Sequence, residues 1–240
     1  MGASEVPGFV RLVGHPLRWR LVGELARSDL RVRELVDLTG EPQNLVSYHL
    51  RLLRDGGLVT SRRSSFDGRD SYYSLDLDRC VTGLADVGAA LHPVLRMAPV
   101  PQSPSTRSSV LFVCSGNSAR SPIAEALLRR RVGTRIRVSS AGTRPKDHVH
   151  PDAIRVLREH YDLDIAGQEP QPLDAVRRGR FDRVITLCDR AREALPDTVP
   201  WPRIHWSIPD PGNYEQVETV AAAIDIRVRQ LIPTLTKEEG

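Results

Sequence analysis

The chain has few cysteines, only Cys80, Cys114 and Cys188 among 240 residues. So few thiols cannot build a disulfide framework, which excludes the small disulfide-rich secreted proteins. No apolar run approaches the roughly 20 residues that span a bilayer. The first residues also lack the basic segment and apolar segment of a secretory signal. We therefore expect a cytoplasmic protein without membrane association, whose thiols stay reduced and do chemistry.

A large excess of charge of one sign is missing as well. The net charge is +4, and residues 1–98 hold 13 basic against 12 acidic side chains, whereas residues 99–240 hold 21 against 18. This balance excludes nucleic-acid binding through bulk charge alone. Any contact with DNA must therefore come from a local arrangement of side chains.

Residues 98–109 are rich in proline and serine and show no apolar period, which is typical of a semi-rigid linker. Before this linker, residues 1–97 show a helical pattern with one hairpin. After it, residues 110–240 alternate between strand and helix patterns. The sequence therefore predicts two domains, one mainly α and one α/β with a parallel sheet.

Apolar residues recur at helical spacing in the first domain over 16–27, 32–39 and 42–55. Residues 58–66 and 69–77 are strand-like, and Asp67-Gly68 between them is a strong hairpin signal. Short helices followed by a helix with a polar face and then by a hairpin predict a winged helix-turn-helix.

The polar face of the third helix and the hairpin carry side chains suited to DNA. Glutamine and asparagine pair with adenine edges in the major groove, and hairpin arginines suit phosphate or the minor groove. Alternatively, these polar residues are only the solvated side of a core helix. The predicted contacts to a double-stranded DNA operator are Gln43, Asn44, Ser47, Tyr48, His49, Arg51, Arg62, Arg63 and Arg69.

A last apolar stripe of the first domain recurs at steps of three and four residues. It consists of Leu84, Val87, Leu91, Val94 and Leu95. Such a helix face needs a partner, so we expect a homodimer through residues 84–95.

This domain resembles the arsenic-repressor (ArsR) family of dimeric bacterial winged-helix repressors. The resemblance covers about residues 8–97 and rests on Gly14-His-Pro-Leu-Arg18, Leu45-Val-Ser-Tyr-His-Leu-Arg-Leu-Leu53 and Asp55-Gly-Gly-Leu-Val59. Arsenite-sensing members carry a Cys-x-Cys pair on the helix before the recognition helix, where this chain has Arg33-Glu-Leu-Val-Asp-Leu-Thr39. Cys80 alone cannot fill a three-coordinate site, so we expect no metal site and a Cys80 that packs in the core.

In the second domain, the apolar run Val110–Val113 leads into Cys114, and Arg120 follows six positions later. Ser121 suits a helix N-cap and Pro122 the first helical position. Backbone N–H groups of residues 115–120 can then surround a tetrahedral oxyanion, helped by the helix dipole and by Arg120. The same positive field favours the thiolate form of Cys114, a nucleophile. The alternative is a buried core cysteine at a strand end.

The rest of this domain predicts strands over 110–113, 135–140, 182–187 and 203–207 and helices over 122–132, 152–161 and 215–235. Alternating strands and helices favour a parallel sheet covered on both faces. Ligands of such sheets bind at the carboxyl ends of the strands, where Cys114 falls.

This domain resembles the low-molecular-weight tyrosine phosphatase fold and, within it, the thioredoxin-type arsenate reductases (ArsC), over about residues 108–236. The resemblance rests on Cys114-Ser-Gly-Asn-Ser-Ala-Arg-Ser-Pro, Ser139-Ser-Ala-Gly-Thr143, Val184-Ile-Thr-Leu-Cys188 and His205-Trp-Ser-Ile-Pro-Asp-Pro-Gly212. It implies that Cys114 attacks the oxyanion, that Arg120 holds two of its oxygens, and that Asp210 is the general acid. It also implies an oxyanion loop of Ser115, Gly116, Asn117, Ser118, Ala119, Arg120 and Ser121, in which Asn117 and Ser121 hold the loop shape and steady the thiolate.

The oxyanion loop by itself does not distinguish a reductase from a phosphatase. A reductase needs a second thiol to attack the Cys114 sulfur, and the resemblance gives this role to Cys188; the alternative is a small buried strand residue. Thioredoxin-coupled reductases have a third cysteine where this chain has Leu195. Both families often have a cysteine directly before the loop arginine, and this chain has Ala119 at that position. We expect no bound cofactor and an external thiol reductant, from the thioredoxin, mycothiol or glutathione system.

The sequence thus predicts a DNA-binding regulator fused to an arsenate reductase that converts arsenate to arsenite. One alternative is a protein tyrosine phosphatase fused to a DNA-binding domain. Phosphatases of this fold usually place aromatic residues just after the Asp-Pro pair, but Gly212-Asn213 precede Tyr214 here. The other alternative is a repressor whose second domain senses oxyanions or oxidation without catalysis.

Overall fold

The computed structural model describes residues 6–66, 68–92, 95, 108–176, 179–195 and 202–235. The chain divides into two compact units, Met1–Pro101 and Gln102–Gly240, each of which is described by itself below. Most of the predicted linker, residues 98–107, lies outside the described residues. Ser108 and Ser109, which the prediction placed in the linker, are buried, and Ser109 begins the first strand of the second unit. Among the described helices, none has the length and apolarity to cross a membrane.

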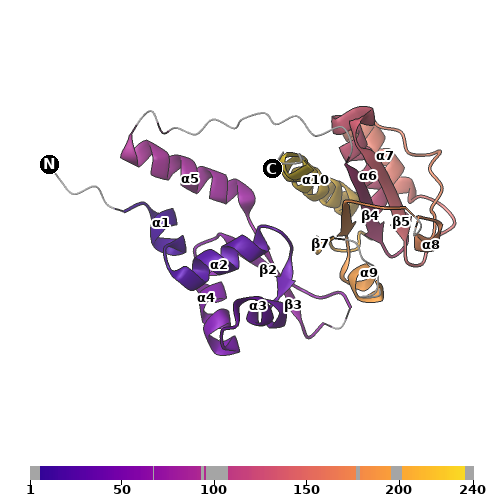
Figure 1. The fold of residues 1–240 in the computed structure, drawn as a ribbon. Coiled ribbons are helices and arrows are strands. Elements are labelled where there is room, and N and C mark those ends of the chain that lie inside the picture. Colours follow the sequence, from indigo (N-terminus) through magenta and orange to yellow (C-terminus); the bar gives the residue numbers. More distant parts are fainter. Residues whose placement is uncertain are drawn as a thin grey trace. The chain divides into compact units, whose positions relative to one another are not determined.

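The first unit is a helical assembly with a small antiparallel sheet in the order β1-β3-β2 (Figure 1). Leucines at helical spacing, such as Leu21, Leu35, Leu50 and Leu53, are fully buried in its core. Predicted and observed bounds agree fully for the helix over 32–39, which a left-handed Gly40 ends. The elements are α1 (Gly8–Val13), α2 (Pro16–Leu25), β1 (Leu30–Arg31), α3 (Val32–Thr39), α4 (Gln43–Asp55), β2 (Val59–Arg63), β3 (Ser71–Leu75) and α5 (Leu77–Leu91).

The hairpin differs from the predicted two-residue turn. Pairing runs from Val59 opposite Leu75 to Arg63 opposite Ser71, so residues 64–70 form a longer connection, of which Asp67 lies outside the described residues. The Asp70 carboxylate lies 3.6 Å from a guanidinium nitrogen of Arg31 and 3.3 Å from one of Arg33. These ion pairs join the Asp70 side chain to the start of α3, while the Asp70 carbonyl accepts a hydrogen bond from the Ser64 N–H at 2.8 Å beyond the last strand pair.

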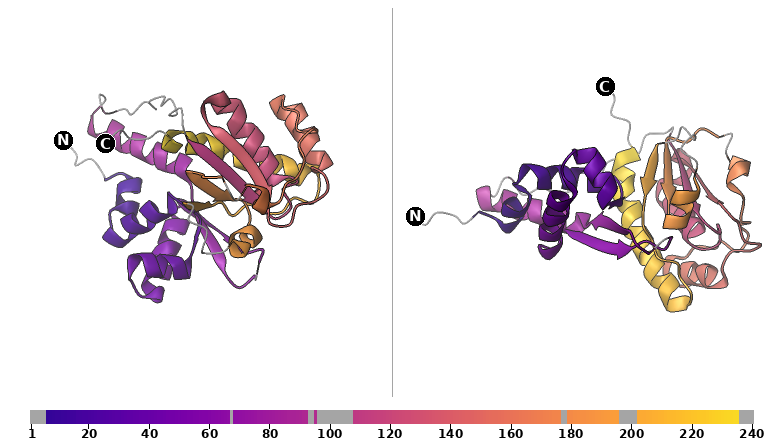
Figure 2. Two further views of the ribbon diagram at one scale, coloured as in Figure 1. Left: turned by 45° about the vertical axis from the view of Figure 1, so that its right-hand side comes forward. Right: turned by 90° about the horizontal axis from the view of Figure 1, so that it is seen from below.

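The second unit contains a parallel sheet in the order β5-β4-β6-β7 (Figures 1 and 2). Helix α6 packs along β4 and β5, and the long α10 packs against α6 and α7. The elements are β4 (Ser109–Cys114), α6 (Arg120–Val132), β5 (Arg137–Gly142), α7 (Pro151–Tyr161), α8 (Leu173–Val176), β6 (Arg183–Thr186), α9 (Asp189–Ala194), β7 (Arg203–His205) and α10 (Tyr214–Leu231).

The central strand β4 positions the site. All six of its residues are buried, because β5 and β6 flank it on both edges and α6 and α9 pack against it. Its last residue, Cys114, pairs with Gly142 at the end of β5. The carboxyl ends of the parallel strands therefore meet at the cysteine, as the alternating pattern predicted.

Candidate active site and DNA-binding surface

The loop between β4 and α6 turns its carbonyl groups outwards. The carbonyls of Cys114, Ser115, Gly116 and Ser118 accept hydrogen bonds of 2.8–3.1 Å from N–H groups of the following segment, residues 143–150. By contrast, the N–H groups of residues 115–120 donate to no atom in the described part of the chain. Uncommitted N–H groups of successive residues form a concave anion-binding surface, so the loop has the geometry of an oxyanion cradle.

Asn117 holds this loop in shape. Its φ of 44° is left-handed, a conformation that asparagine tolerates better than most residues. Its Nδ2 donates to Oγ of Ser121 at 2.9 Å and to Oγ of Ser140 at 2.8 Å, and its Oδ1 accepts from the Gln171 N–H at 2.8 Å. The buried amide thus ties the loop to β5 and to the segment after α7.

Ser121 is not the helix N-cap that the sequence predicted. Helix α6 begins at Arg120, two residues earlier than predicted, with Ala119 as its cap residue and no capping side chain. The Ser121 hydroxyl is instead fully buried and lies 3.0 Å from the Cys114 sulfur. A hydroxyl in this position can donate to a thiolate, so Ser121 serves the cysteine rather than the helix end.

Arg120 is buried and faces two partners from the segment after β7. Its guanidinium donates to the Ile208 carbonyl at 3.2 Å and pairs with Asp210 at 2.7 Å. The Asp210 side chain is 72% exposed, whereas that of Arg120 is only 7% exposed. Asp210, the predicted general acid, therefore lies at the solvent edge of the cradle and is held there by Arg120.

Cys188 lies next to the same loop. It follows β6 at the start of α9 and is buried, and the Leu187 N–H donates to the Val113 carbonyl at 2.7 Å. The Cys188 sulfur is 3.3 Å from the Ser115 hydroxyl. Both Cys114 and Cys188 are unpaired thiols. The structure therefore brings together two cysteines that are 74 positions apart in the sequence.

In the first unit, most of the predicted base-reading residues lie on the exposed face of α4. Gln43, Asn44, Ser47, Tyr48 and Arg51 are exposed, and the Arg51 guanidinium lies 5.6 Å from the centre of the Tyr48 ring. The hairpin residues Arg63 and Arg69 are exposed and Arg62 is half-buried, its side chain turned back to the Arg63 carbonyl.

His49, also predicted to contact DNA, does not reach this surface. It is 4% exposed, on the core side of α4 beside Val46 and Leu50. Its ring stacks on His15 with 4.3 Å between the ring centres, and its Nδ1 has no partner among the described residues. Burial lowers the pKa of His49, and its electrostatic interactions with His15 and Arg18 lower it further. Helical spacing places positions 46, 49, 50 and 53 on one face, which is the buried face of α4, so the prediction for His49 was wrong.

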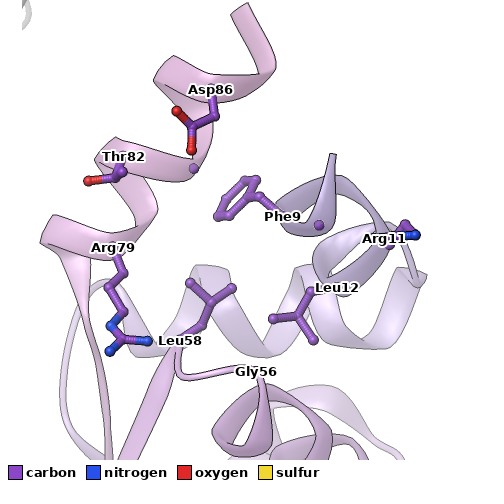
Figure 3. A pocket seen from close by; sticks show the side chains of 10 residues that line it. Phe9, Arg11, Leu12, Gly56, Leu58, Arg79, Thr82 and Asp86 are labelled. Carbon is purple, nitrogen blue, oxygen red and sulfur yellow. The ribbon is translucent and has the colours of Figure 1, made fainter. Parts of the chain in front are cut away.

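Helix α5 presents apolar side chains to solvent. Val81, Leu84 and Leu91 of this helix are exposed, and Val87 is half-buried. Of the rest of the predicted stripe, Leu95 lies beyond α5 and is exposed, and Val94 lies outside the described residues. Beside this face, an open hollow of about 690 Å³ lies where α1 packs against α5 (Figure 3). Phe9 and Leu12 line it from α1, and Arg79, Thr82 and Asp86 line it from α5.

Comparison with known families identifies both units. Residues 109–240 match the family model described as low molecular weight phosphotyrosine protein phosphatase, which is more than half of the chain. The chain belongs to this phosphatase family. Residues 15–61 match the model of the bacterial regulatory proteins of the arsR family, so the first unit contains a helix-turn-helix region of that type.

Several relatives of the phosphatase-family unit carry the name arsenate reductase. Arsenate reductase 2 of Bacillus cereus is 34% identical over 131 residues, which are 53% of this chain and 96% of the relative. A solved arsenate reductase in the phosphate-binding state is 30% identical and covers 54% of this chain and 99% of its own, with a TM-score of 0.48. A low molecular weight protein tyrosine phosphatase from T. tengcongensis is 24% identical over 53% of this chain and 99% of its own, also with a TM-score of 0.48.

Tyr214 of the phosphatase-family unit is engaged by α7. Its hydroxyl donates to the Glu159 carboxylate and lies 3.0 Å from Nε2 of His160. The Arg155 guanidinium lies 4.3 Å from the centre of its ring. These contacts hold the first aromatic residue after the Asp210-Pro211 pair against α7.

The sequence did not reveal a buried polar network beside Cys188. Oδ1 of the fully buried Asp189 lies 2.7 Å from the Ser207 hydroxyl and 3.2 Å from Nε2 of His205, and Nδ1 of His205 lies 2.8 Å from the Thr186 hydroxyl. The network ties the Cys188 turn to the segment that leads to Asp210. The only sequence signal was the motif beginning at His205, in which the serine and histidine received no role.

Cys80 is buried in the core of the first unit, and burial together with the nearby Asp76 carboxylate raises its pKa. Within the described residues, no group of three histidine, cysteine or carboxylate side chains is arranged to hold a metal ion.

Proposed function

We propose that the second unit is a thiol-dependent arsenate reductase and that the first unit binds a double-stranded DNA operator. The observation that carries the reductase assignment is the position of Cys188, whose sulfur lies 3.3 Å from the hydroxyl of Ser115 in the oxyanion loop. A hydrolytic phosphatase needs one thiol, whereas reduction needs two that can meet. The names of the relatives at 34% identity support the same assignment.

In the first step, the Cys114 thiolate attacks the arsenic atom of arsenate. A sulfur–arsenic bond forms, and one arsenate hydroxyl group leaves as water after it takes a proton from Asp210. The uncommitted N–H groups of residues 115–120 and the Arg120 guanidinium bind the remaining oxygens. Because Asp210 already contacts Arg120 at 2.7 Å, it needs little movement to reach a leaving oxygen.

In the second step, the Cys188 thiolate attacks the Cys114 sulfur. A disulfide forms as the sulfur–arsenic bond breaks, and the bonding electron pair stays on arsenic. Arsenic is thereby reduced from As(V) to As(III) and leaves as arsenite, while two thiols are oxidised. An external thiol from the thioredoxin, mycothiol or glutathione system then restores both cysteines.

The alternative of a tyrosine phosphatase is less well supported by the residues around the site. An aryl phosphate needs an apolar wall beside the cradle for its ring. Tyr214 is the first aromatic side chain after the acid, and its contacts with Arg155 and Glu159 hold it against α7. A small inorganic oxyanion needs no such wall.

For the first unit, we propose that α4 enters the major groove and that the hairpin arginines contact the backbone or minor groove. The residues assigned to this surface are Gln43, Asn44, Ser47, Tyr48, Arg51, Arg62, Arg63 and Arg69. Exposed Val81, Leu84 and Leu91 on α5 support a homodimer through that helix, which would pair two recognition helices on one operator.

The test is arsenite production from arsenate by the purified full chain with a panel of thiol reductants. Cys114→Ser and Cys188→Ser variants and an aryl-phosphate hydrolysis control run beside it. Arsenite release that both substitutions abolish supports the two-thiol reductase. Aryl-phosphate turnover that needs Cys114 but not Cys188, without arsenite, contradicts it. If neither assay gives product and operator binding changes on thiol oxidation, the second unit is better explained as a sensor.

A further inference from the structure

The segment that follows β5 forms one side of the active-site opening. The N–H groups of Arg144 and Lys146 donate to the carbonyls of Ser115 and Gly116 at 2.8 and 2.9 Å, so residues 143–150 run beside the oxyanion loop. The Lys146 stem lies over Gly116: a Cβ added there would meet Cγ, Cδ and Cε of Lys146 at 3.3–3.6 Å. The ammonium group, one bond beyond Cε, therefore stands at the edge of the cradle.

The two basic side chains, here called the cationic rim, are exposed. Neither Arg144 nor Lys146 forms an ion pair with any residue that the structure describes. Asp147 follows in the same segment, so residues 144–147 carry a net charge of +1. Across the opening, Asp210 is paired with Arg120. The opening therefore presents positive charge that is not neutralised within the described part of the unit, next to N–H groups that also favour anions.

The proposed cycle leaves a Cys114–Cys188 disulfide that something must open. Both cysteines are buried, with 2% and 1% of their residue surfaces exposed, and the position seven residues after Cys188 is a buried leucine, Leu195. This unit has no further cysteine to carry the disulfide to the surface. A small thiol fits an opening shaped for a tetrahedral oxyanion, whereas the cysteine of a folded redoxin would need the disulfide to move outwards.

We propose that the cationic rim recruits a low-molecular-weight thiol that bears carboxylates, and that this thiol regenerates the enzyme. The inference rests on the proposed reductase function. A carboxylate on the thiol interacts with Arg144 and Lys146 while its thiolate enters the cradle beside Arg120. Electrostatic attraction at such an opening raises the encounter rate of anions and weakens with salt.

The chemistry consumes two thiols in each cycle. The first thiolate attacks the Cys114 sulfur, the disulfide bond breaks, and Cys188 leaves as a thiolate and takes a proton. A second thiolate attacks the sulfur of the bound small thiol in the mixed disulfide, and Cys114 leaves as a thiolate. The two small thiols are oxidised to one disulfide as both cysteines are reduced.

The experiment measures reduction of the oxidised full chain by thiols of different charge. The protein is first oxidised with diamide, and mass spectrometry locates the Cys114–Cys188 disulfide. Mercaptoacetate, 2-mercaptoethanol and cysteamine are then compared, each rate being divided by that thiol's rate with 2,2′-dithiodipyridine, an uncharged disulfide, to remove differences in intrinsic reactivity. We expect mercaptoacetate to exceed 2-mercaptoethanol by about threefold to tenfold and cysteamine to be slowest, with the differences collapsing at high salt.

Variants separate the rim from the charge of the whole protein. Arg144→Gln and Lys146→Gln should each reduce the advantage of mercaptoacetate, whereas Lys146→Arg keeps the charge and should preserve it. Arg135→Gln is the matched control, because Arg135 is an exposed arginine just before β5, at the opposite end of the sheet. It should leave the full advantage in place.

The outcomes distinguish this inference from the function on which it rests. The role of the cationic rim alone is overturned if the disulfide forms but the three thiols reduce it at equal normalised rates. The same holds if the rim variants keep the ranking of rates that the wild type shows. A thioredoxin that reduces the protein far faster than mercaptoacetate at equal concentration overturns the small-thiol assignment. Failure of the Cys114–Cys188 disulfide to form overturns the two-thiol cycle and this inference with it.

Discussion

The two units organise their polar side chains in opposite ways. In the second unit, Cys114, Asn117 and Ser121 are buried and hydrogen-bonded to one another. In the first unit, Gln43, Asn44 and Ser47 project from α4 into solvent. Catalysis requires groups already fixed before the substrate arrives, whereas a DNA-binding face obtains its partners from the DNA itself. The comparison indicates that substitutions in the second unit should displace the other groups of the active site. Substitutions on α4 should leave the fold intact and remove only contacts with DNA.

The largest effect is expected from Asn117. Replacing it with alanine removes three hydrogen bonds and leaves a left-handed residue without the side chain that tolerates it. Because a displaced catalytic group costs about 10²-fold in rate, we expect at least that loss in kcat for arsenate reduction. Steady-state kinetics and the thermal transition of the second unit measure the two consequences.

Asn117→Gly is the matched control, since glycine accepts the same φ without strain. It should lose activity like the alanine variant but unfold at a higher temperature than that variant. Equal activity of Asn117→Gly and the wild type would show that the hydrogen bonds do not hold the cradle, and the contrast between the two units would then disappear.

An intermediate effect is expected from the hairpin arginines of the first unit. Arg62→Gln combined with Arg63→Gln should weaken operator binding by about tenfold and leave the fold unchanged. If each arginine neutralises one phosphate, the slope of log affinity against log salt should become less steep by about 2. Fluorescence anisotropy over a salt series measures both quantities. An unchanged slope would remove the hairpin from the DNA interface.

The smallest effect concerns His49, the buried exception in α4. Its folded-state pKa lies below the ordinary value near 6.5, because burial disfavours the imidazolium. Below that pH the unfolded chain binds a proton that the folded chain does not, so this contribution to stability is present above about pH 6.5 and is lost as the pH falls. Calorimetry across pH 5–8 should show the first unit's transition moving to lower temperature on acidification.

His49→Leu removes the titration and should flatten this pH dependence. The thermal unfolding transition of the first unit is identified as the one whose temperature Asn117→Ala does not change, because Asn117 lies in the second unit. A wild-type transition that does not move between pH 8 and pH 5 would contradict the depressed pKa of His49.

Local sequence carried enough information where a feature depends on neighbouring residues. The apolar run before Cys114 and the residues that follow it specify strand β4 and the loop, and the helix Val32–Thr39 ends at a glycine that the structure holds in the left-handed region. Short elements such as β1 and α9 have too few residues for a periodic signal, and packing decides them. The predicted helix over 215–235 stops at Leu231, with a 3₁₀ turn at Ile232–Leu235 that contains Pro233, a residue without an N–H.

Features that depend on distant residues were out of reach. The sequence suggested a helix cap for Ser121, but the hydroxyl is used by the thiol that lies next to it only after folding. The contact of Asp189 with His205 and Ser207 joins segments at least 16 positions apart, and no spacing rule connects them. The hairpin connection of residues 64–70 likewise differs from a strong local signal, and Asp70 within it pairs with Arg31 and Arg33, more than 30 positions away.

The orientation of the peptide groups in the oxyanion loop has a consequence for competition inside a cell. N–H groups recognise the shape and charge of a tetrahedral anion and not the element at its centre, so phosphate should occupy the cradle as readily as arsenate. A thiol can draw arsenic(V) down to arsenic(III), whereas phosphorus(V) resists such reduction. Discrimination would therefore come after binding, at the attack of Cys188, and phosphate would act as a reversible competitor that sets how much arsenate is needed before the reaction becomes appreciable.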